Sequence, residues 1–346
     1  MTIAETVEAR LVESLQPIRQ YVLAACIYHW FESGLFDTLA GDDGQSIKEL
    51  AGRLGFDEGR LGTMLQFLVN EGLVCRTADR FALTQKGRSL SDFRAWYTML
   101  IGGYGSTFLQ LGDKLKRGSG SASRIAQQVG IGSCGISHYD SIPLTRRLMT
   151  KIPGGVKTML DLGCGNGLYL VEFCKALPDL EAWGAEPDPA GYEAAVALVK
   201  REQLEHRIHL SCSGAREFFR TAREFTPDMT VFGFVLHEIL GQEGEEGVLA
   251  FLRELIERYP DIYLIVIEVD FQMENPAIMR HELALAYYNA YYLLHPFTNQ
   301  RLESRSFWSD LFTRAGLDIL ATDVVEPSVD STGLEIGFLL RRAGAN

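Results

Sequence analysis

The chain has 346 residues, of which 47% are hydrophobic and 10% aromatic, so its composition excludes a disordered or fibrous protein. This length exceeds what one core usually holds, and we expect more than one domain. The net charge is −12, from 33 Lys and Arg against 45 Asp and Glu, which disfavours nucleic acid as the main partner because phosphate contacts need a basic surface.

Membrane and secretory features are missing from the sequence pattern. No apolar run approaches the ~20 residues that span a bilayer, and the longest, residues 21–31, carries His29. The first dozen residues are acidic and lead into no small-residue cleavage site of a secretory signal. The six cysteines form no C-x-x-C pair, which is typical of buried thiols in a reducing compartment. We therefore expect a soluble, cytoplasmic protein without a membrane partner.

Residues 1–92 have the pattern of a winged-helix domain, in which short helices precede a hairpin. Apolar residues recur at helical spacing over 11–35. Ser46 followed by Glu49 is a capping-box pattern, and Asp57 can cap the next helix. Two short strands joined by a tight turn are expected to complete the domain.

Two functions remain open for this N-terminal domain. A winged helix most often binds DNA, but its second helix, residues 59–70, has no run of Lys or Arg to face phosphates. The apolar stretch 21–36 exceeds what a domain of about 90 residues easily buries alone, which favours dimerisation. We expect a homodimer, and a DNA-binding regulator stays a competing hypothesis.

Residues 93–150 are predicted to be a helical linker that covers a pocket. Aromatic residues, among them Trp96, precede the Gly/Ser stretch 117–123, which indicates a flexible connection or a loop over a site. Trp96 is a candidate pocket wall, although core packing fits it equally well. Arg124 is a candidate for binding a substrate carboxylate, against the more common solvated arginine.

Residues 151–346 alternate strands with helices, which is typical of a parallel sheet with crossover connections. The seven predicted strands are 158–162, 181–185, 208–212, 229–236, 262–268, 317–325 and 335–340. The expected fold class is α/β, with a seven-stranded Rossmann-like domain behind a mostly helical N-terminal domain.

A D-x-G-x-G-x-G motif, formed by Asp161, Gly163, Gly165 and Gly167, ends the first of these strands and opens a helix. Glycines let the backbone turn sharply and let a ligand approach the peptide groups closely. Glu186 ends the next strand, where an acid can accept hydrogen bonds from ribose hydroxyls. A nicotinamide dinucleotide fingerprint, G-x-G-x-x-G, would place its third glycine one residue later.

This form resembles the S-adenosylmethionine (SAM) site of class I methyltransferases. Nearly the whole chain is similar to small-molecule methyltransferases that dimerise through their N-terminal domain. The similarity rests on the glycine motif, the winged-helix front end, E-P-D at 186–188 and V-L-H-E at 235–238. The resemblance implies that Asp161 and the three glycines line the methionine part of SAM and that Glu186 holds the ribose. Where many relatives have an Asp for the adenine amine, this chain has Gly214, so Ser213 or backbone groups are expected there.

Three residues are candidate metal ligands: His237 follows a strand, Glu268 ends the next one, and His295 lies in a helix-to-loop region expected to fold back over the sheet edge where these strands end. Two imidazoles and a carboxylate are typical of Fe(II) or Zn(II) sites, and ends of neighbouring strands meet at one sheet edge. In the other interpretation, His237 is a general base, Glu268 orients it, and His295 lies at the surface. The spacing resembles metal-dependent C-methyltransferases that act on the β-carbon of 2-oxo acids in antibiotic and non-protein amino-acid pathways, above all the 2-ketoarginine type. That resemblance implies a divalent or trivalent ion, Fe or Zn, on these three side chains.

A metal ion would explain how a carbon nucleophile forms, because a C–H beside a ketone is a weak acid and a Lewis acid stabilises its enolate. Glu238 is a candidate for removing the β-proton, or merely a favourable acid at a helix start. The acids available for a substrate guanidinium are Glu238, Asp270, Glu274 and Glu282, and the sequence does not choose among them. The alternative function is a metal-independent O-methyltransferase on a phenol or enol, with His237 as general base.

Overall fold

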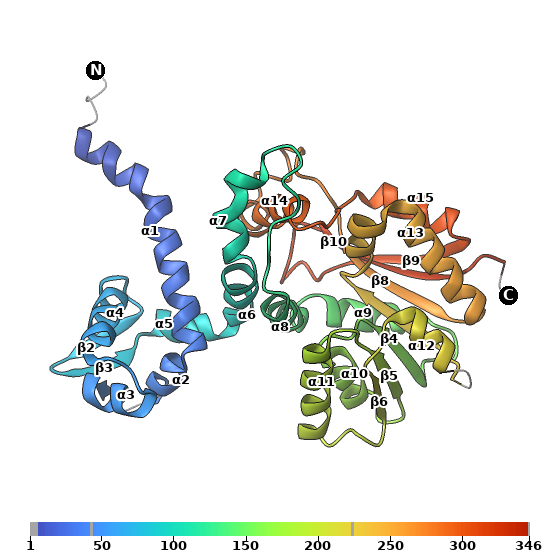
Figure 1. The fold of residues 1–346 in the computed structure, drawn as a ribbon, viewed down its shortest axis with the longest axis horizontal. Coiled ribbons are helices and arrows are strands. Elements are labelled where there is room, and N and C mark those ends of the chain that lie inside the picture. The colour runs from blue at the N-terminus through green and yellow to red at the C-terminus, as the bar shows by residue number, and fades with distance from the viewer. Residues whose placement is uncertain (1–5, 42–43, 223–224, 345–346) are drawn as a thin grey trace. The chain divides into compact units, whose positions relative to one another are not determined.

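A computed structural model of the protein describes residues 6–41, 44–222 and 225–344. The chain forms two compact units, Met1–Gly103 and Tyr104–Asn346, which are described separately (Figure 1). Across the described ranges, no helix combines the length and the apolar character needed to cross a membrane.

The first unit contains one long helix, several shorter ones and a small antiparallel sheet with strand order β1-β3-β2. Its elements are α1 (Val7–Glu32), α2 (Leu35–Leu39), β1 (Gln45–Ser46), α3 (Ile47–Leu54), α4 (Glu58–Asn70), β2 (Val74–Thr77), β3 (Arg80–Leu83), α5 (Gln85–Ser89), η1 (Leu90–Phe93), α6 (Arg94–Tyr97) and η2 (Thr98–Gly103). The predicted capping box at Ser46 and Glu49 is present, and the Asp57 side chain caps α4. The predicted order of helices and hairpin is confirmed, whereas the winged-helix assignment stays a prediction.

The second unit is built on a seven-stranded sheet with the order β6-β5-β4-β7-β8-β10-β9. Its strands are β4 (Thr158–Leu162), β5 (Glu181–Ala185), β6 (Ile208–Ser211), β7 (Met229–Gly233), β8 (Tyr263–Val269), β9 (Leu317–Val324) and β10 (Glu335–Arg342). All seven predicted strands are present, and the predicted α/β fold class is confirmed. Strand β10 runs antiparallel to both neighbours, so the sheet is mostly rather than wholly parallel.

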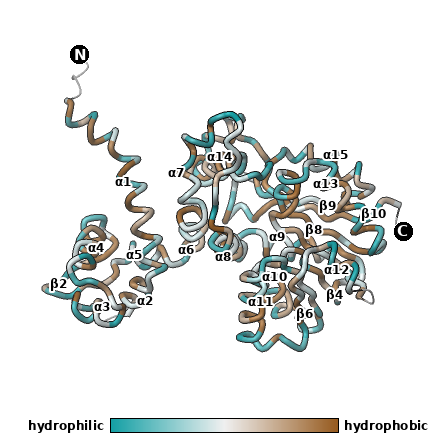
Figure 2. The backbone as a smooth tube through the Cα atoms, viewed as in Figure 1, coloured by the Kyte–Doolittle hydropathy of each residue, from teal (hydrophilic) through white to brown (hydrophobic). Residues whose placement is uncertain are grey.

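Helices cover both faces of this sheet, which explains why its central strands are hydrophobic along their length (Figure 2). The helices are α7 (Gly105–Lys114), α8 (Ala126–Ser137), α9 (Ser141–Met149), α10 (Leu168–Ala176), α11 (Pro189–Arg201), α12 (Ala215–Thr221), α13 (Leu236–Arg258), η3 (Ala284–Tyr288), α14 (Asn289–Phe297) and α15 (Arg305–Arg314). In β8, Leu264 and Val266 pack in the core that includes α13 and α15, while Ile265 and Ile267 pack in the core that includes α9 and α10.

The parallel strands all end at one edge of the sheet, and the candidate functional residues gather there. Strand β4 leads into the glycine motif, and Glu186 follows β5. His237 lies in the first turn of α13 directly after β7, and Glu268 lies at the end of β8.

Candidate active site

The glycine motif forms a tight loop that only glycine adopts without strain. Gly163, Gly165 and Gly167 have φ angles of 82°, 53° and 75°, all in the left-handed region. A Cβ atom at Gly167 would also stand 3.1 Å from the Cβ of Ala195 in α11. The sharp turn therefore leaves backbone groups facing the carboxyl edge, as a bound cofactor requires.

Glu186 ties the end of β5 to this glycine loop. Its Oε2 accepts the N–H of Gly165 and its Oε1 accepts the N–H of Asp188, both at 2.8 Å, and the side chain is buried. The carboxylate thus holds two backbone segments in place and keeps further lone pairs for a ligand hydroxyl.

Asp161 lies buried at the end of β4. Burial, and then the charge of Glu186, raise the pKa of Asp161 to about 7. A cationic ligand beside it would favour the ionised carboxylate.

The candidate adenine contacts lie after β6. The hydroxyl groups of Ser213 and Ser211 share a hydrogen bond of 2.8 Å, and Ser213 is buried. Gly214 precedes α12 as its N-cap with an extended backbone. Their role toward adenine stays a prediction.

His237 and Glu268 form a buried pair. The imidazole Nδ1 lies 2.8 Å from Glu268 Oε2, and the backbone N–H of His237 donates to Oε1 at 3.1 Å. Burial opposes the charged imidazole, but Glu268 outweighs it, and the pKa of His237 is raised. A carboxylate only accepts hydrogen bonds, so Nδ1 carries the proton and Nε2 presents its lone pair in the neutral ring.

His295 faces His237, with ring centroids 5.1 Å apart. Its Nδ1 lies 2.6 Å from the carbonyl oxygen of Tyr291 and therefore donates to it, which again leaves Nε2 unprotonated. Burial, together with the neighbouring His237, lowers the pKa of His295 well below its ordinary value, so the ring stays neutral.

The three predicted metal ligands lie together, but they do not form a ligand cage. Across the described part of the chain, no group of three or more His, Cys, Asp or Glu side chains is arranged to hold a metal ion. Both carboxylate oxygens of Glu268 are engaged by His237, one by its backbone N–H and the other by its Nδ1. In neutral rings the two imidazole Nε2 atoms would fit a metal ion as donors, and Glu268 fits the role of the carboxylate that orients a ligating histidine.

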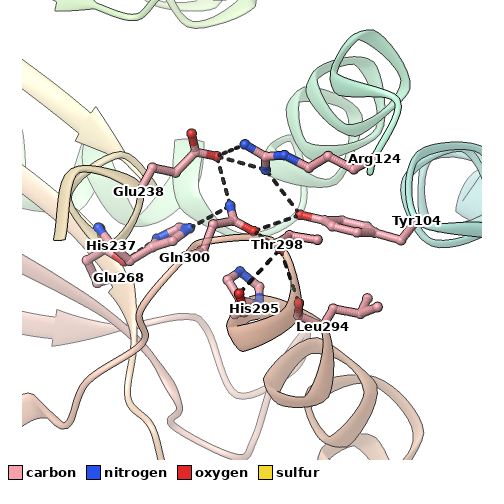
Figure 3. A network of polar contacts seen from close by, with 9 residues as sticks. All are labelled: Tyr104, Arg124, His237, Glu238, Glu268, Leu294, His295, Thr298 and Gln300. Atoms are coloured by element: carbon pink, nitrogen blue, oxygen red, sulfur yellow. Dashed lines mark hydrogen bonds and ion pairs between the residues drawn. The ribbon is translucent and has the colours of Figure 1, made fainter. Parts of the chain in front are cut away.

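A polar network beside the histidines joins Arg124, Glu238, Gln300 and Tyr104 (Figure 3). Both terminal nitrogens of Arg124 donate to Glu238 Oε1 at 3.0 Å, and Gln300 Nε2 donates to the same oxygen at 2.8 Å. The Tyr104 hydroxyl reaches Gln300 Oε1 at 3.3 Å, and Gln300 Nε2 lies 3.4 Å from His237 Nε2. The predicted substrate ligand Arg124 is thus engaged by the predicted base Glu238, whose Oε2 remains available.

Gln300 is a site residue that the sequence did not indicate, whereas Tyr104 is one of the linker aromatics from which a pocket cover is predicted. Asn299, with a left-handed φ of 59°, turns the chain so that Gln300 points back toward His237. A Cβ atom at Gly241 would stand 2.4 Å from the Asn299 carbonyl oxygen, so this close approach requires glycine in α13. No spacing in the sequence signals such a contact between distant segments.

The Gly/Ser segment before Arg124 is fixed by hydrogen bonds rather than free. The N–H of Ala122 donates to Phe297 at 2.6 Å, and the Ser123 carbonyl accepts from Thr107 at 2.8 Å. Of the two predicted roles, a loop over a site agrees better with these contacts than a flexible connection. Trp96 belongs to the first unit, where it packs on Phe93 with ring centroids 5.8 Å apart, and its role as a pocket wall stays a prediction.

Comparison with known proteins adds to this geometry. The chain is 42% identical over 347 residues to the 2-ketoarginine methyltransferase of Streptomyces arginensis, covering 99% of each chain. Among solved structures, human N-acetylserotonin methyltransferase in complex with SAM matches with a TM-score of 0.67 and 16% identity over 100% of both chains. Mitomycin 7-O-methyltransferase matches with a TM-score of 0.67 and 20% identity over 97% of this chain and 99% of that one. No protein-family model matches the chain.

Proposed function

Because the chain belongs to the 2-ketoarginine methyltransferase family, we propose that it transfers the methyl group of SAM to the β-carbon of a 2-oxo acid. We expect this acid to be 5-guanidino-2-oxopentanoate (2-ketoarginine). The observation that carries the proposal is the identity along the whole chain together with two facing imidazoles at the carboxyl edge of the sheet.

The donor half of the site would bind SAM through the glycine loop and two buried acids. Asp161 would face the cationic methionine part, with Gly163, Gly165 and Gly167 around it, and Glu186 would accept the ribose hydroxyls. Ser213 and the backbone at Gly214 would approach the adenine. This placement follows the resemblance and agrees with the burial of both acids.

The acceptor half would hold the 2-oxo acid between the histidines and the Arg124–Glu238 pair. Glu238 Oε2 would take the β-proton, and the resulting carbon nucleophile would displace S-adenosylhomocysteine from the sulfonium methyl. Glu268 would keep the proton of His237 on Nδ1, so that Nε2 faces the substrate. Arg124 would bind the substrate carboxylate, sharing its charge with Glu238.

A metal ion held by the Nε2 atoms of His237 and His295 would supply Lewis acidity at the ketone oxygen. The second candidate function is a metal-independent O-methyltransferase on a phenol or enol. The specific observation favouring it is the His237–Glu268 pair, which has the geometry of a general base and its orienting acid.

The two candidates predict different results for His295→Ala. A ligand role makes this variant lose at least a hundredfold in kcat on 2-ketoarginine and lose bound Fe or Zn, whereas an O-methyltransferase tolerates it. The measurement is product mass after reaction with SAM, before and after chelation, together with metal analysis of both proteins. His281→Ala is the control, because His281 is half-buried and its ring contacts Ser331 and the N–H of Leu283 rather than the candidate site. Full activity after thorough chelation would contradict the metal mechanism.

SAM affinity is expected to rise with pH through the ionisation of Asp161. Its raised pKa, about 7, means that Asp161 is mostly protonated at pH 6 and must lose its proton to pair with a cation. We expect the Kd for SAM to fall roughly five- to tenfold between pH 6 and pH 7.5, by calorimetric titration. Asp161→Asn should bind more weakly and flatten this slope, and an unchanged slope would assign the pH dependence to another group.

The homodimer and the cytoplasmic location stay predictions. The dimer is supported by large apolar side chains exposed along α1 of the first unit, namely Val7, Leu11, Val12, Leu15, Ile18, Tyr21 and Val22.

A further inference from the structure

Two carboxyl groups that the mechanism does not use, Asp140 and Glu335, meet in the interior of the second unit. Asp140 is the N-cap of α9 and Glu335 is the first residue of β10, and they are only 8% and 4% exposed. They lie within hydrogen-bonding reach of each other. Two carboxylates this close in a dry environment do not both ionise unless a cation joins them.

The described residues supply no such cation. Neither carboxyl forms an ion pair with a Lys, Arg or His of the described residues. Burial, and then the neighbouring acids Asp140 and Asp330, raise the pKa of Glu335 well above its ordinary value. Burial also raises the pKa of Asp140 to about 6.

One oxygen of the pair has no partner at all. Glu335 Oε1 is buried and receives no hydrogen bond from the part of the chain that the structure describes. An unsatisfied buried acceptor is costly, and native structures contain few of them. A donor that arrives with a ligand would satisfy it.

The pair lies next to the proposed acceptor half. In the β8–β10 ladder, Glu335 is opposite Val269 and the following residue is opposite Glu268. Neighbouring strands are ~4.8 Å apart. In the proposed substrate, five bonds separate the ketone carbon from the guanidinium carbon, on the order of 6 Å when extended. Side chains alternate along a strand, so Glu335 and Glu268 lie on opposite faces of the sheet and can meet one small molecule only around its carboxyl edge. Burial, and then charges that include Glu268 and Glu335, raise the pKa of Tyr291, which lies near both acids.

An aromatic wall connects the acid pair with the histidines. The Tyr291 ring is 4.0 Å from the His295 ring and 5.8 Å from the Tyr287 ring. Tyr287 is half-buried beside the acids, and burial, followed by the charges of Asp140 and Glu335, raises its pKa. Such a wall suits the alkyl chain of a substrate whose two ends are polar.

We propose that Glu335 and Asp140 bind the guanidinium group of the substrate, with Tyr287 and Tyr291 along its alkyl chain. This inference rests on the proposed function and specifies its side-chain selectivity. A guanidinium presents its N–H donors as a planar fork that matches carboxylates, and its charge lets both acids ionise.

The four acids named from the sequence are less suited to this role, and two of them, Glu274 and Glu282, are exposed. Glu238 is engaged by Arg124 and Gln300 through one oxygen. Asp270 accepts the backbone N–H of Arg305 and the side chain of Gln272. Asp270 therefore has a donor on each oxygen, and Glu238 Oε2 is assigned to the β-proton, whereas Glu335 Oε1 receives no hydrogen bond from the described residues.

The test compares 5-guanidino-2-oxopentanoate with its neutral isostere 5-ureido-2-oxopentanoate, with SAM as donor. We expect the wild-type protein to prefer the guanidino acid, and Glu335→Gln to lose about a hundredfold in kcat/KM on it, mainly through KM. The same variant should change less than about threefold on the ureido acid. Asp140→Asn should show the same selectivity change, and Glu326→Gln, at an exposed loop position, is the matched control.

Binding of S-adenosylhomocysteine and the melting temperature report whether each variant is folded. Equal losses on both substrates in Glu335→Gln and Asp140→Asn would mean that the pair only supports the fold, and would overturn the inference. Equal wild-type activity on both acids would overturn it too, while leaving 2-oxo acid methylation intact. A wild-type protein that methylates no 2-oxo acid would instead remove the proposed function and the inference with it.

Discussion

Replacing His237 with Asn is expected to lower kcat at least a thousandfold while the Kd for SAM stays within about twofold. The Asn side chain can still donate a hydrogen bond to Glu268, as Nδ1 does at 2.8 Å, but it has no atom at the position of Nε2. Both candidate functions need that atom, one as a general base and one as a metal donor, and losing a positioned base costs roughly 10²–10⁴-fold. Single-turnover kinetics with calorimetric titration of SAM separates chemistry from cofactor binding.

Two further variants make this test specific. Glu268→Gln should cost less than His237→Asn, roughly ten- to a hundredfold, because it removes the group that orients His237 but keeps the imidazole. His206→Asn, at an exposed position before β6, should leave kcat unchanged. Retention of a tenth of wild-type kcat by His237→Asn would contradict a role for Nε2 in the reaction.

The strands of the sheet could be predicted because burial on both faces demands continuous hydrophobic segments. β4 and β5 match the predicted ranges, and the other predicted strand ends differ by one to three residues. The direction of β10 could not be predicted, because the same apolar segment fits a parallel or an antiparallel position. The reversal follows from the tertiary pairing of Gly337 with Ile267.

The glycine and acid positions of the proposed donor half could be identified from the sequence, since they stand at strand ends that the topology brings to one edge. The acceptor half was accessible only in part. The sequence identifies His237, Glu268 and His295, but their grouping depends on the resemblance. In the structure, Glu268 bonds to His237, and the described residues form no three-ligand cage. Tyr104 and Gln300, 196 positions apart, meet through tertiary packing alone.

The proposed donor and acceptor halves of the site are held together by different kinds of hydrogen bond, so mutations in them should have different effects. Loop and strand ends in the donor half are joined by backbone N–H groups that donate to Glu186. The acceptor half is joined by side chains, which converge on Glu238 and Gln300. Changes at Glu186 should therefore disturb cofactor binding broadly, whereas changes in the acceptor half should alter turnover or selectivity.

Glu186→Gln is expected to raise the Kd for SAM about a hundredfold. The carboxylate accepts the N–H groups of Gly165 and Asp188 at 2.8 Å, and the amide nitrogen of Gln would oppose one of these two donors. Charge-assisted hydrogen bonds of this kind contribute roughly 1.5–3 kcal/mol, and their loss would add to the weakened ribose contact. Calorimetric titration with SAM and with S-adenosylhomocysteine measures the effect without a turnover assay.

Glu181→Gln provides the matched control, because Glu181 begins the same strand β5 but is exposed and far along it from the loop. It should bind SAM like the wild-type protein. With saturating SAM, Glu186→Gln should regain most of its kcat, because the groups around His237 are untouched. A Glu186→Gln variant with wild-type affinity for SAM would show that the glycine loop keeps its shape without this carboxylate and that the ribose is held elsewhere.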